Sequence, residues 1–381
     1  MNNEYTLLLP LAAEPQGGFT AGSQIDFLMN HPGKLLESGT FRLTGRSSVL
    51  NGGNPLDADS TLRLNSNAGA HSFLNHLIIM FNENNVEMNT EYARYVAANN
   101  ESRKSCLELG TLSSEITELT GCDQDGSGDN LSKTYLQGQQ GGQNDGSMPF
   151  SILLNCCLNK SNGDIPLSKT GPVRVRMILK QPSDVFCGDD TINVADVTYS
   201  LSNLCLRYVL KDDPGLKQPV MMERVQYAGQ QTLQSTYNTF NTICPSSFNS
   251  CILLFKDSTH NNSTTFNYDS ILNENFADAS GSVISNYVEW TLMGMDTPLT
   301  FPLRTQEEQI QNYILAHNKS LTKHGLNYAK LNNPGIPSGW GLGCYFGNDI
   351  PSMPVQCTIN FNNNLANYYN VYVFYKGSIV V

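Results

Sequence analysis

The feature that most constrains this sequence is a long succession of short β-type runs, separated from one another by Gly, Asn, Pro and Asp. The alternation is clear in residues 173–179, where Val173, Val175 and Met177 fall on one face of an extended chain and the two intervening arginines on the other. Short strands joined by regularly spaced turns are typical of β-sandwiches. The pattern therefore predicts an all-β protein.

A strong turn signal, Lys-Asp-Asp-Pro-Gly at residues 211–215, divides the runs into two similar sets. About seven runs precede this turn and about seven follow it, at the spacing expected of a sandwich. The runs cover residues 24–29, 35–50, 61–64, 73–81, 150–158, 173–179 and 197–210 in the first set, and 219–228, 248–255, 264–271, 283–292, 341–346, 355–361 and 368–381 in the second. We predict an N-terminal arm at residues 1–18, a first sandwich at 19–212 and a second at 216–381, with no single sheet running through the boundary.

Three segments depart from the strand pattern. Residues 90–98 and 305–323 have helical patterns; Thr305 can cap the second helix, and Glu308 follows three residues later. Residues 110–146 are rich in Gly, Gln, Ser and Asp and carry no strand signal, which predicts a long exposed loop.

The chain has few charged residues, and acidic residues outnumber basic ones. Charged residues make up 15% of the chain, against about 25% in average globular proteins, and the formal net charge is −11. Such a composition excludes a charged coiled coil and a disordered acidic chain. A basic groove for nucleic acid is also disfavoured as the main activity, because phosphates would be repelled.

The N-terminal segment and the cysteines bear on where the protein is made. Residues 6–13 resemble a short signal segment, but no basic region precedes them and Pro10 interrupts them, so we interpret them as part of a mature arm. The sequence contains no run of about 18 apolar residues, so no membrane-spanning helix is predicted. The ten cysteines are too sparse for a disulfide framework in a chain of this length, which favours buried reduced thiols in a protein made inside cells.

A calcium loop is the best candidate for a metal site. Asp123, Asp125, Ser127 and Gly128 match the start of an EF-hand loop, but Thr134 stands where a bidentate Glu is required. A solvated loop is therefore the preferred interpretation.

Other chemical motifs are absent from the sequence. The cysteines and histidines lack paired zinc-ligand spacing, and His71 and His76 are expected to be structural. There is no nucleophile elbow and no phosphate-binding glycine motif; the glycines around Trp340 are better explained by a tight bend. We predict no catalytic, cofactor-binding or metal-binding residues, no cofactor, and a protein that is not an enzyme.

Several passages resemble the double jelly-roll major capsid proteins of the adenovirus–tectivirus lineage, which includes those of polinton-like viruses, virophages and adintoviruses. The first is a strand-like passage at residues 62–87 followed by a helix containing Tyr92 and Tyr95. The others are residues 149–177, 199–206 and 370–379. The resemblance covers most of residues 20–210 and then only the C-terminal end.

This resemblance implies a double jelly roll, meaning two tandem eight-stranded jelly-roll sandwiches with short helical excursions. It also implies a structural role as a viral major capsid protein, which forms pseudo-hexagonal homotrimeric capsomers that tile an icosahedral shell. Two sandwiches per chain agree with this role, since three chains then have a sixfold outline. A viral or secreted carbohydrate- or receptor-binding β-sandwich protein remains the alternative.

The expected partners follow from the same resemblance. They are other copies of the chain, penton and minor capsid proteins, and an internal membrane, which the arm at Leu7, Leu8 and Leu9 could contact. Direct sequence-specific binding of nucleic acid is not expected. The protein would be located in the virion capsid, after synthesis and assembly inside the host cell.

Overall fold

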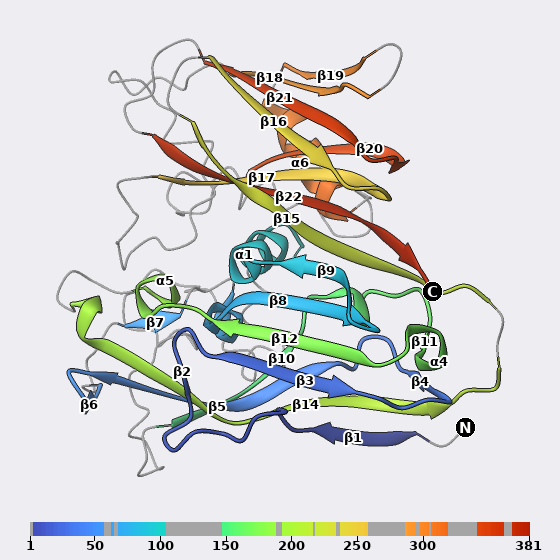
Figure 1. Cartoon of the computed structure of the whole chain (residues 1–381). Helices are drawn as coiled ribbons and strands as arrows, with labels where there is room; N and C mark the ends of the chain where they lie inside the picture. The colour runs from blue at the N-terminus through green and yellow to red at the C-terminus, as the bar shows by residue number, and fades with distance from the viewer. Residues whose placement is uncertain are drawn as a thin grey trace.

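The chain forms two stacked β-bodies, each with its own apolar core (Figure 1). The computed structural model describes residues 3–56, 62–64, 68–103, 147–187, 193–215, 218–233, 237–257, 286–294, 298–304, 306–318, 341–361 and 368–381. The predicted loop at 110–146 and the predicted strand at 264–271 lie outside these residues. The all-β prediction is confirmed, because strands dominate both bodies.

One sheet of the first body, called sheet A here, is built on the long strand β14 (Val197–Asp212). Its path is β10 (Ser147–Leu153), β5 (Arg42–Asn51), β14, β4 (Lys34–Leu36) and β11 (Ile165–Pro166). Three short strands complete it: β1 (Glu4–Leu8) and β2 (Phe19–Thr20) on β14, and β6 (Asn54–Pro55) on β5.

The other large sheet, called sheet B, contains strands of both bodies. Its order is β20 (Leu342–Ile350), β17 (Phe248–Asp257), β22 (Tyr369–Val380), β15 (Met221–Leu233), β9 (Asn84–Asn89), β8 (Leu74–Phe81), β12 (Val173–Leu179) and β3 (Gln24–Met29). A four-stranded sheet of β16 (Tyr237–Cys244), β21 (Met353–Phe361), β18 (Asn286–Leu292) and β19 (Leu299–Leu303) closes the second body. A two-stranded sheet pairs β7 (Arg63–Leu64) with β13 (Phe186–Cys187).

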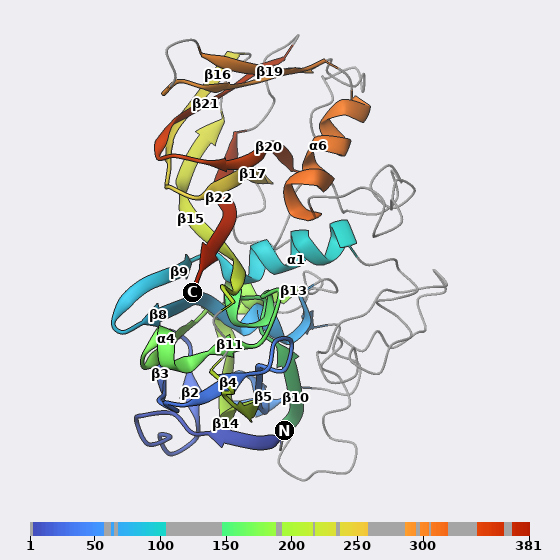
Figure 2. The same ribbon diagram turned by 90° about the vertical axis from the view of Figure 1, so that its right-hand side faces the viewer.

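Helices are few among the described residues. They are α1 (Tyr92–Arg103), α4 (Leu167–Thr170), α5 (Pro182–Val185) and α6 (Gln306–Asn318), with 3-10 turns η1 (Gly69–Phe73), η2 (Cys157–Asn159) and η3 (Val194–Asp196). The two predicted helices are thus present, α1 running five residues beyond its predicted end at residue 98. Figure 2 shows α6 beside β20 and β17, with α1 beneath it at the level where the two bodies meet.

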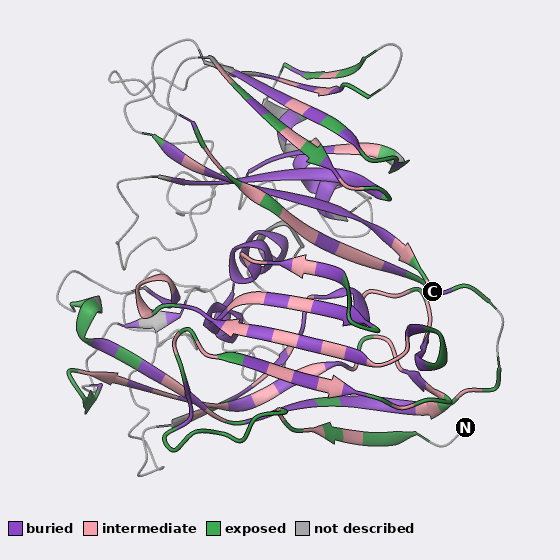
Figure 3. Ribbon diagram, in the orientation of Figure 1, coloured by how far each residue is buried: buried purple, intermediate pink, exposed green. Residues whose placement is uncertain are grey.

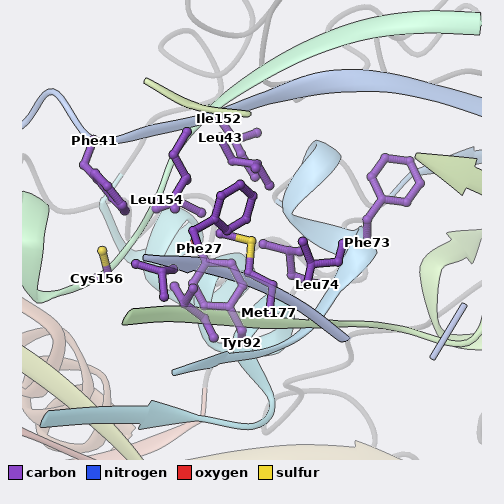
Figure 4. Close-up of a cluster of buried hydrophobic side chains, with 14 of the residues drawn as sticks. Phe27, Phe41, Leu43, Phe73, Leu74, Tyr92, Ile152, Leu154, Cys156 and Met177 are labelled. Atoms are coloured by element: carbon purple, nitrogen blue, oxygen red, sulfur yellow. The ribbon is translucent and has the colours of Figure 1, made fainter. Parts of the chain in front are cut away.

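The first core fills the space between sheet A and the β9-β8-β12-β3 half of sheet B. Phe27, Met177, Leu43 and Ile152 meet there from strands on both sides (Figure 4). The alternation predicted for β12 is confirmed: Val173, Val175 and Met177 are buried and the arginines between them are half-buried on the other face, as the banding in Figure 3 shows. The alternation in the sequence therefore determines which side chains of β12 enter this core.

The second core lies between the β20-β17-β22-β15 half of sheet B and the four-stranded sheet. Trp290 is its largest fully buried side chain, and Val355 and Phe374 pack in the same cluster. Helix α6 contacts β20 and β17 and adds Tyr313 to this core. Each body can thus bury an apolar interior of its own.

The boundary between the bodies differs in part from expectation. Strand β14 ends at Asp212 and β15 begins at Met221, and the two strands belong to different sheets. However, sheet B spans both bodies through one parallel pairing, in which Gln226 of β15 lies opposite Met88 of β9. The sequence did not predict this lateral join, because β9 and β15 are far apart in the chain and each also has a conventional antiparallel partner.

The N-terminal arm contains a strand that the sequence pattern does not indicate. Residues 4–8 pair antiparallel with β14, from Glu4 opposite Leu210 to Leu8 opposite Leu206. The length of β14 explains the pairing, because it leaves backbone donors and acceptors at a sheet edge that the arm satisfies.

Gly377 of β22 provides a test of how closely the second body is packed. A Cβ at this position would overlap the carbonyl oxygen of Ser247 and the Cα of Phe248, which are backbone atoms that cannot move aside cheaply. We expect Gly377→Ala to lower the free energy of unfolding by about 1–3 kcal/mol, the range for overpacking. Denaturant-induced unfolding measures this. Gly163→Ala is the matched control, because a Cβ at Gly163 meets nothing within 4 Å. Equal stability of the two variants would contradict the packing described here.

Candidate assembly surfaces

The residues weighed as metal ligands do not come together in the described part of the chain. Residues 123–129, the candidate calcium loop, lie outside it, as does Trp340. Among the described residues, no group of three or more His, Cys, Asp or Glu side chains is placed to hold a metal ion. No helix among them is long and apolar enough to cross a membrane.

Two of the described histidines, His71 and His317, are buried and pack against aromatic rings. His71 lies in η1, where its Nδ1 is 3.0 Å from the hydroxyl of Tyr92, and that hydroxyl accepts the backbone N–H of Asn155 at 2.8 Å. His317 is buried at the end of α6, with its ring against those of Tyr95 and Tyr313. These contacts connect η1 to α1 and α1 to α6, and both histidines are buried.

The cysteines whose side chains are described are free and buried, in agreement with the sequence-based expectation. They are Cys156, Cys157, Cys205, Cys244, Cys251, Cys344 and Cys357. Burial raises the pKa of the Cys244 thiol to about 12, and the pKa of Cys156 also rises, mainly through burial and then through the nearby Glu87. Such thiols are poor nucleophiles, because the reactive thiolate is suppressed.

The most unusual side chains of the molecule are charged groups buried where the two bodies meet, which we call the seam. On the α1 side of the seam, the carboxylate of Glu91 lies 3.3 Å from Lys180 Nζ and 3.6 Å from Arg94 Nε. Burial opposes ionisation of Glu91, but the adjacent Lys180 and Arg94 together outweigh it and hold the pKa of the carboxyl below its ordinary value. Arg94 also places its guanidinium 4.0 Å from the centre of the Tyr372 ring on β22, so this cluster contacts both bodies.

Glu87 of β9 joins the two bodies directly. Its Oε2 accepts the N–H of Cys157, in the first body, at 2.7 Å, and its Oε1 accepts the N–H of Val225, on β15 of the second body, at 3.0 Å. The side chain is 2% exposed. Burial raises the pKa of this carboxyl from 4.5 to about 7, although both N–H donors and the nearby Lys160 oppose the rise.

A third group of charges completes the seam on the side of β15. Glu223 lies 3.2 Å from Lys160 of the first body and 3.0 Å from Lys376 of β22. Lys376 is fully buried and also donates to the backbone carbonyl of His317. Glu223 thus connects Lys160, which follows η2, with Lys376 of β22, and Lys376 in turn contacts the end of α6.

Sequence reasoning missed these seam residues, since none stood in a recognised motif. One signal was available: Arg94 is the only charged residue in the helical segment from Tyr92 to Asn100. A lone charge in such a helix must find a buried partner. The partners themselves come from distant parts of the chain.

The exposed surface shows a different feature, an apolar stripe along the N-terminal arm. Tyr5, Leu7, Leu9 and Leu11 are each more than half exposed, whereas the intervening Leu8 packs against the first core. The backbone N–H of Leu11 donates to the carbonyl of Asp26 on β3, so the arm passes from the edge of sheet A to the edge of sheet B. Contiguous exposed apolar side chains of this kind mark interaction sites.

Glu87 gives the seam a pH dependence with a definite sign. A carboxyl whose pKa is raised in the folded state stabilises the fold fully below its unfolded pKa and loses that contribution as pH rises through the folded pKa. The loss should therefore occur between about pH 4.5 and pH 7. We expect the stability of the wild type relative to Glu87→Gln to fall across this window and to level off above it, as measured by denaturant unfolding at a series of pH values.

Glu83→Gln is the control for this measurement, because it removes an exposed carboxylate only four residues away. Its surface ion pair with Arg174 should contribute little. Parallel pH profiles for the wild type and Glu87→Gln would contradict the role given to Glu87.

Comparison with known proteins identifies the fold. No protein-family model matches the sequence, and no curated protein sequence matches it. Among solved structures, the Faustovirus major capsid protein matches with a TM-score of 0.61 at 9% identity, over 100% of this chain and 90% of that chain. The PBCV-1 virus capsid matches with a TM-score of 0.59 at 10% identity, over 100% and 94%.

A third solved structure agrees with these two. The mavirus major capsid protein matches with a TM-score of 0.51 at 10% identity, over 98% of this chain and 86% of that chain. The matches extend through both bodies, including residues 215–365, where the sequence resemblance is loose. The chain therefore has the double jelly-roll fold found in viral major capsid proteins, as the sequence resemblance implied.

Proposed function

We propose that this chain is a viral major capsid protein whose working unit is a homotrimeric, pseudo-hexagonal capsomer of an icosahedral shell. The observation that carries the proposal is the whole-chain match of its fold to viral major capsid proteins, over 98–100% of this chain. We assign residues 19–212 and 216–381 to the two jelly rolls and residues 1–18 to an arm. The role is structural, and the protein is not an enzyme.

The two cores supply the physical argument for a trimer. Each body buries its own interior, so each chain presents two similar sandwiches. Three such chains have six similar corners, and a block with this outline tiles a curved hexagonal lattice. The seam charges support the same function, because a capsomer must keep its two sandwiches in a fixed relation.

The net charge guides the choice of partners. A charge of −11 per chain disfavours direct contact between the shell and the phosphates of a genome. We therefore propose that the partners are other copies of the chain, penton and minor capsid proteins, and an internal membrane, with the mature protein located in the virion. The apolar stripe of the arm supports contact with a neighbour or a membrane.

Light scattering of the purified protein tests the trimer. We expect a mass about three times 42.0 kDa that persists across a wide dilution range, because obligate interfaces bury more than about 2,000 Å². Electron microscopy should show hexagonal particles or shells. A stable monomer at micromolar concentration that does not assemble at higher concentration would overturn the proposal. Glycan-array binding by such a monomer would favour a carbohydrate-binding protein.

A further inference from the structure

The outer face of sheet A carries a row of four side chains that we call the arginine row. Leu153 of β10 lies opposite Arg42 of β5, Arg42 opposite Arg207 of β14, and Arg207 opposite Leu7 of β1. The row points away from the first core. Successive side chains of a strand point to opposite faces, and the sequence neighbours of the two arginines, Leu43 and Leu206, are buried in that core. Four strands therefore contribute to one outward-facing line.

The two arginines at the centre of this row are an electrostatic anomaly. Like charges directly opposite each other on neighbouring strands destabilise a sheet. Within the described part of the chain, neither Arg42 nor Arg207 forms an ion pair with a carboxylate. A folded chain that keeps such a pair on its surface leaves both positive charges available to an anionic group.

On the outer face of sheet B in the same body, the arginines are paired with carboxylates. On β12, Arg176 donates to Asp26 at 2.8 Å and Arg174 donates to Glu83 at 2.8 Å. Those cations are neutralised within the chain. Among the described residues, no carboxylate plays this part for Arg42 or Arg207.

The surroundings of the arginine row are those of a protein interface. Tyr5 is 84% exposed and Leu7 53% exposed, and both lie on β1, which pairs with β14 along one edge only among the described strands. Tyrosine and arginine are enriched in interface hot spots, and apolar side chains form interface centres. An unpaired strand edge also offers backbone groups to a partner.

We propose that the arginine row, together with Tyr5 beside it, is a contact between copies of this chain, in which a second copy supplies carboxylates to Arg42 and Arg207. The chain contains 34 acidic residues and 23 Lys and Arg, an excess of 34 − 23 = 11 carboxylates that no cation of the same chain can match. A second copy therefore always carries suitable groups. This inference rests on the proposed function, since it names one surface through which the capsomers would assemble.

A second copy is favoured over a phosphate surface by the charge balance. Two arginines in a chain of net charge −11 are too few to overcome repulsion from a nucleic acid or an anionic membrane. A protein contact is local instead, and charges more than about 10 Å away are screened at moderate salt. Leu7 and Leu153 at the two ends of the row can supply the apolar part of such a contact.

Charge reversal at Arg207 tests the proposal without endangering the fold. Arg207→Glu places an opposite charge across from Arg42, which should leave the monomer as stable as the wild type or more stable. We expect the same change to weaken association between copies at least about tenfold, because it opposes the incoming carboxylates. Sedimentation or light scattering over a dilution series measures association, and thermal unfolding measures stability.

Arg174→Glu is the matched control, because it reverses an arginine on the other outer face of the same body. It should leave association unchanged. Equal association by wild type and Arg207→Glu, or an equal loss in both variants, would overturn the arginine row as a contact while leaving the capsid proposal intact. A wild type that never associates would instead overturn the proposed function.

The other possible occupants have their own readouts. The wild type and Arg207→Glu can be compared for flotation with vesicles containing phosphatidylserine and for binding to double-stranded DNA. We expect the two proteins to behave alike in both assays, because the arginine row does not hold phosphate groups. Binding by the wild type that Arg207→Glu abolishes, with association unaffected, would show that phosphate groups occupy the row and would overturn the choice of a second copy.

Discussion

Buried charges lie at the contact between the two bodies, and the proposed function depends on that contact. Within sheet B a single strand pairing joins the bodies, and apolar side chains cross between them, Met222 of β15 into the first core and Tyr95 of α1 into the second. Glu87 restrains them by accepting one N–H from each body, and Glu223 does so by holding Lys160 and Lys376. These links are short and directional, which an apolar contact of the same area would not be.

Buried charge is a costly way to join two bodies, and the cost has a structural consequence. Taking an ion pair out of water requires close geometry and further hydrogen bonds to offset desolvation, and well-packed apolar residues are often as stable. The seam meets these conditions at Glu91, which faces both Lys180 and Arg94, and at Lys376, which also donates to a carbonyl. Removing one partner would leave an uncompensated charge, so the seam tolerates only one relative placement of the bodies. A building block that must fit a regular lattice requires this kind of rigidity.

Much of the fold could be predicted from local sequence, and the seam could not. The period-two pattern of β12 identified its buried face, and the turn at residues 211–215 lies where β14 leaves sheet A. The seam joins residues such as Glu91 and Lys180, which are 89 positions apart, and local patterns carry no information on such pairs. The strand in the N-terminal arm was missed for a related reason, because its partner β14 lies about 200 positions further along the chain, from Leu206 to Leu210. Cys156 and Cys157 were correctly expected to be buried because burial follows from apolar runs alone.

The distribution of charge follows one rule across the molecule. Inside the seam, each described cation faces a carboxylate of the same chain or an aromatic ring, because an unpaired charge could not be buried there. On the outer face of sheet B, Arg176 is paired with Asp26 at the surface, where the pair contributes little to stability but leaves the face neutral. On the outer face of sheet A, Arg42 and Arg207 face each other. Among the described residues nothing offsets that repulsion, whereas the proposed contact with a second copy would. Acidic chains that associate need cations that are not already paired within each chain, and the arginine row supplies two of them.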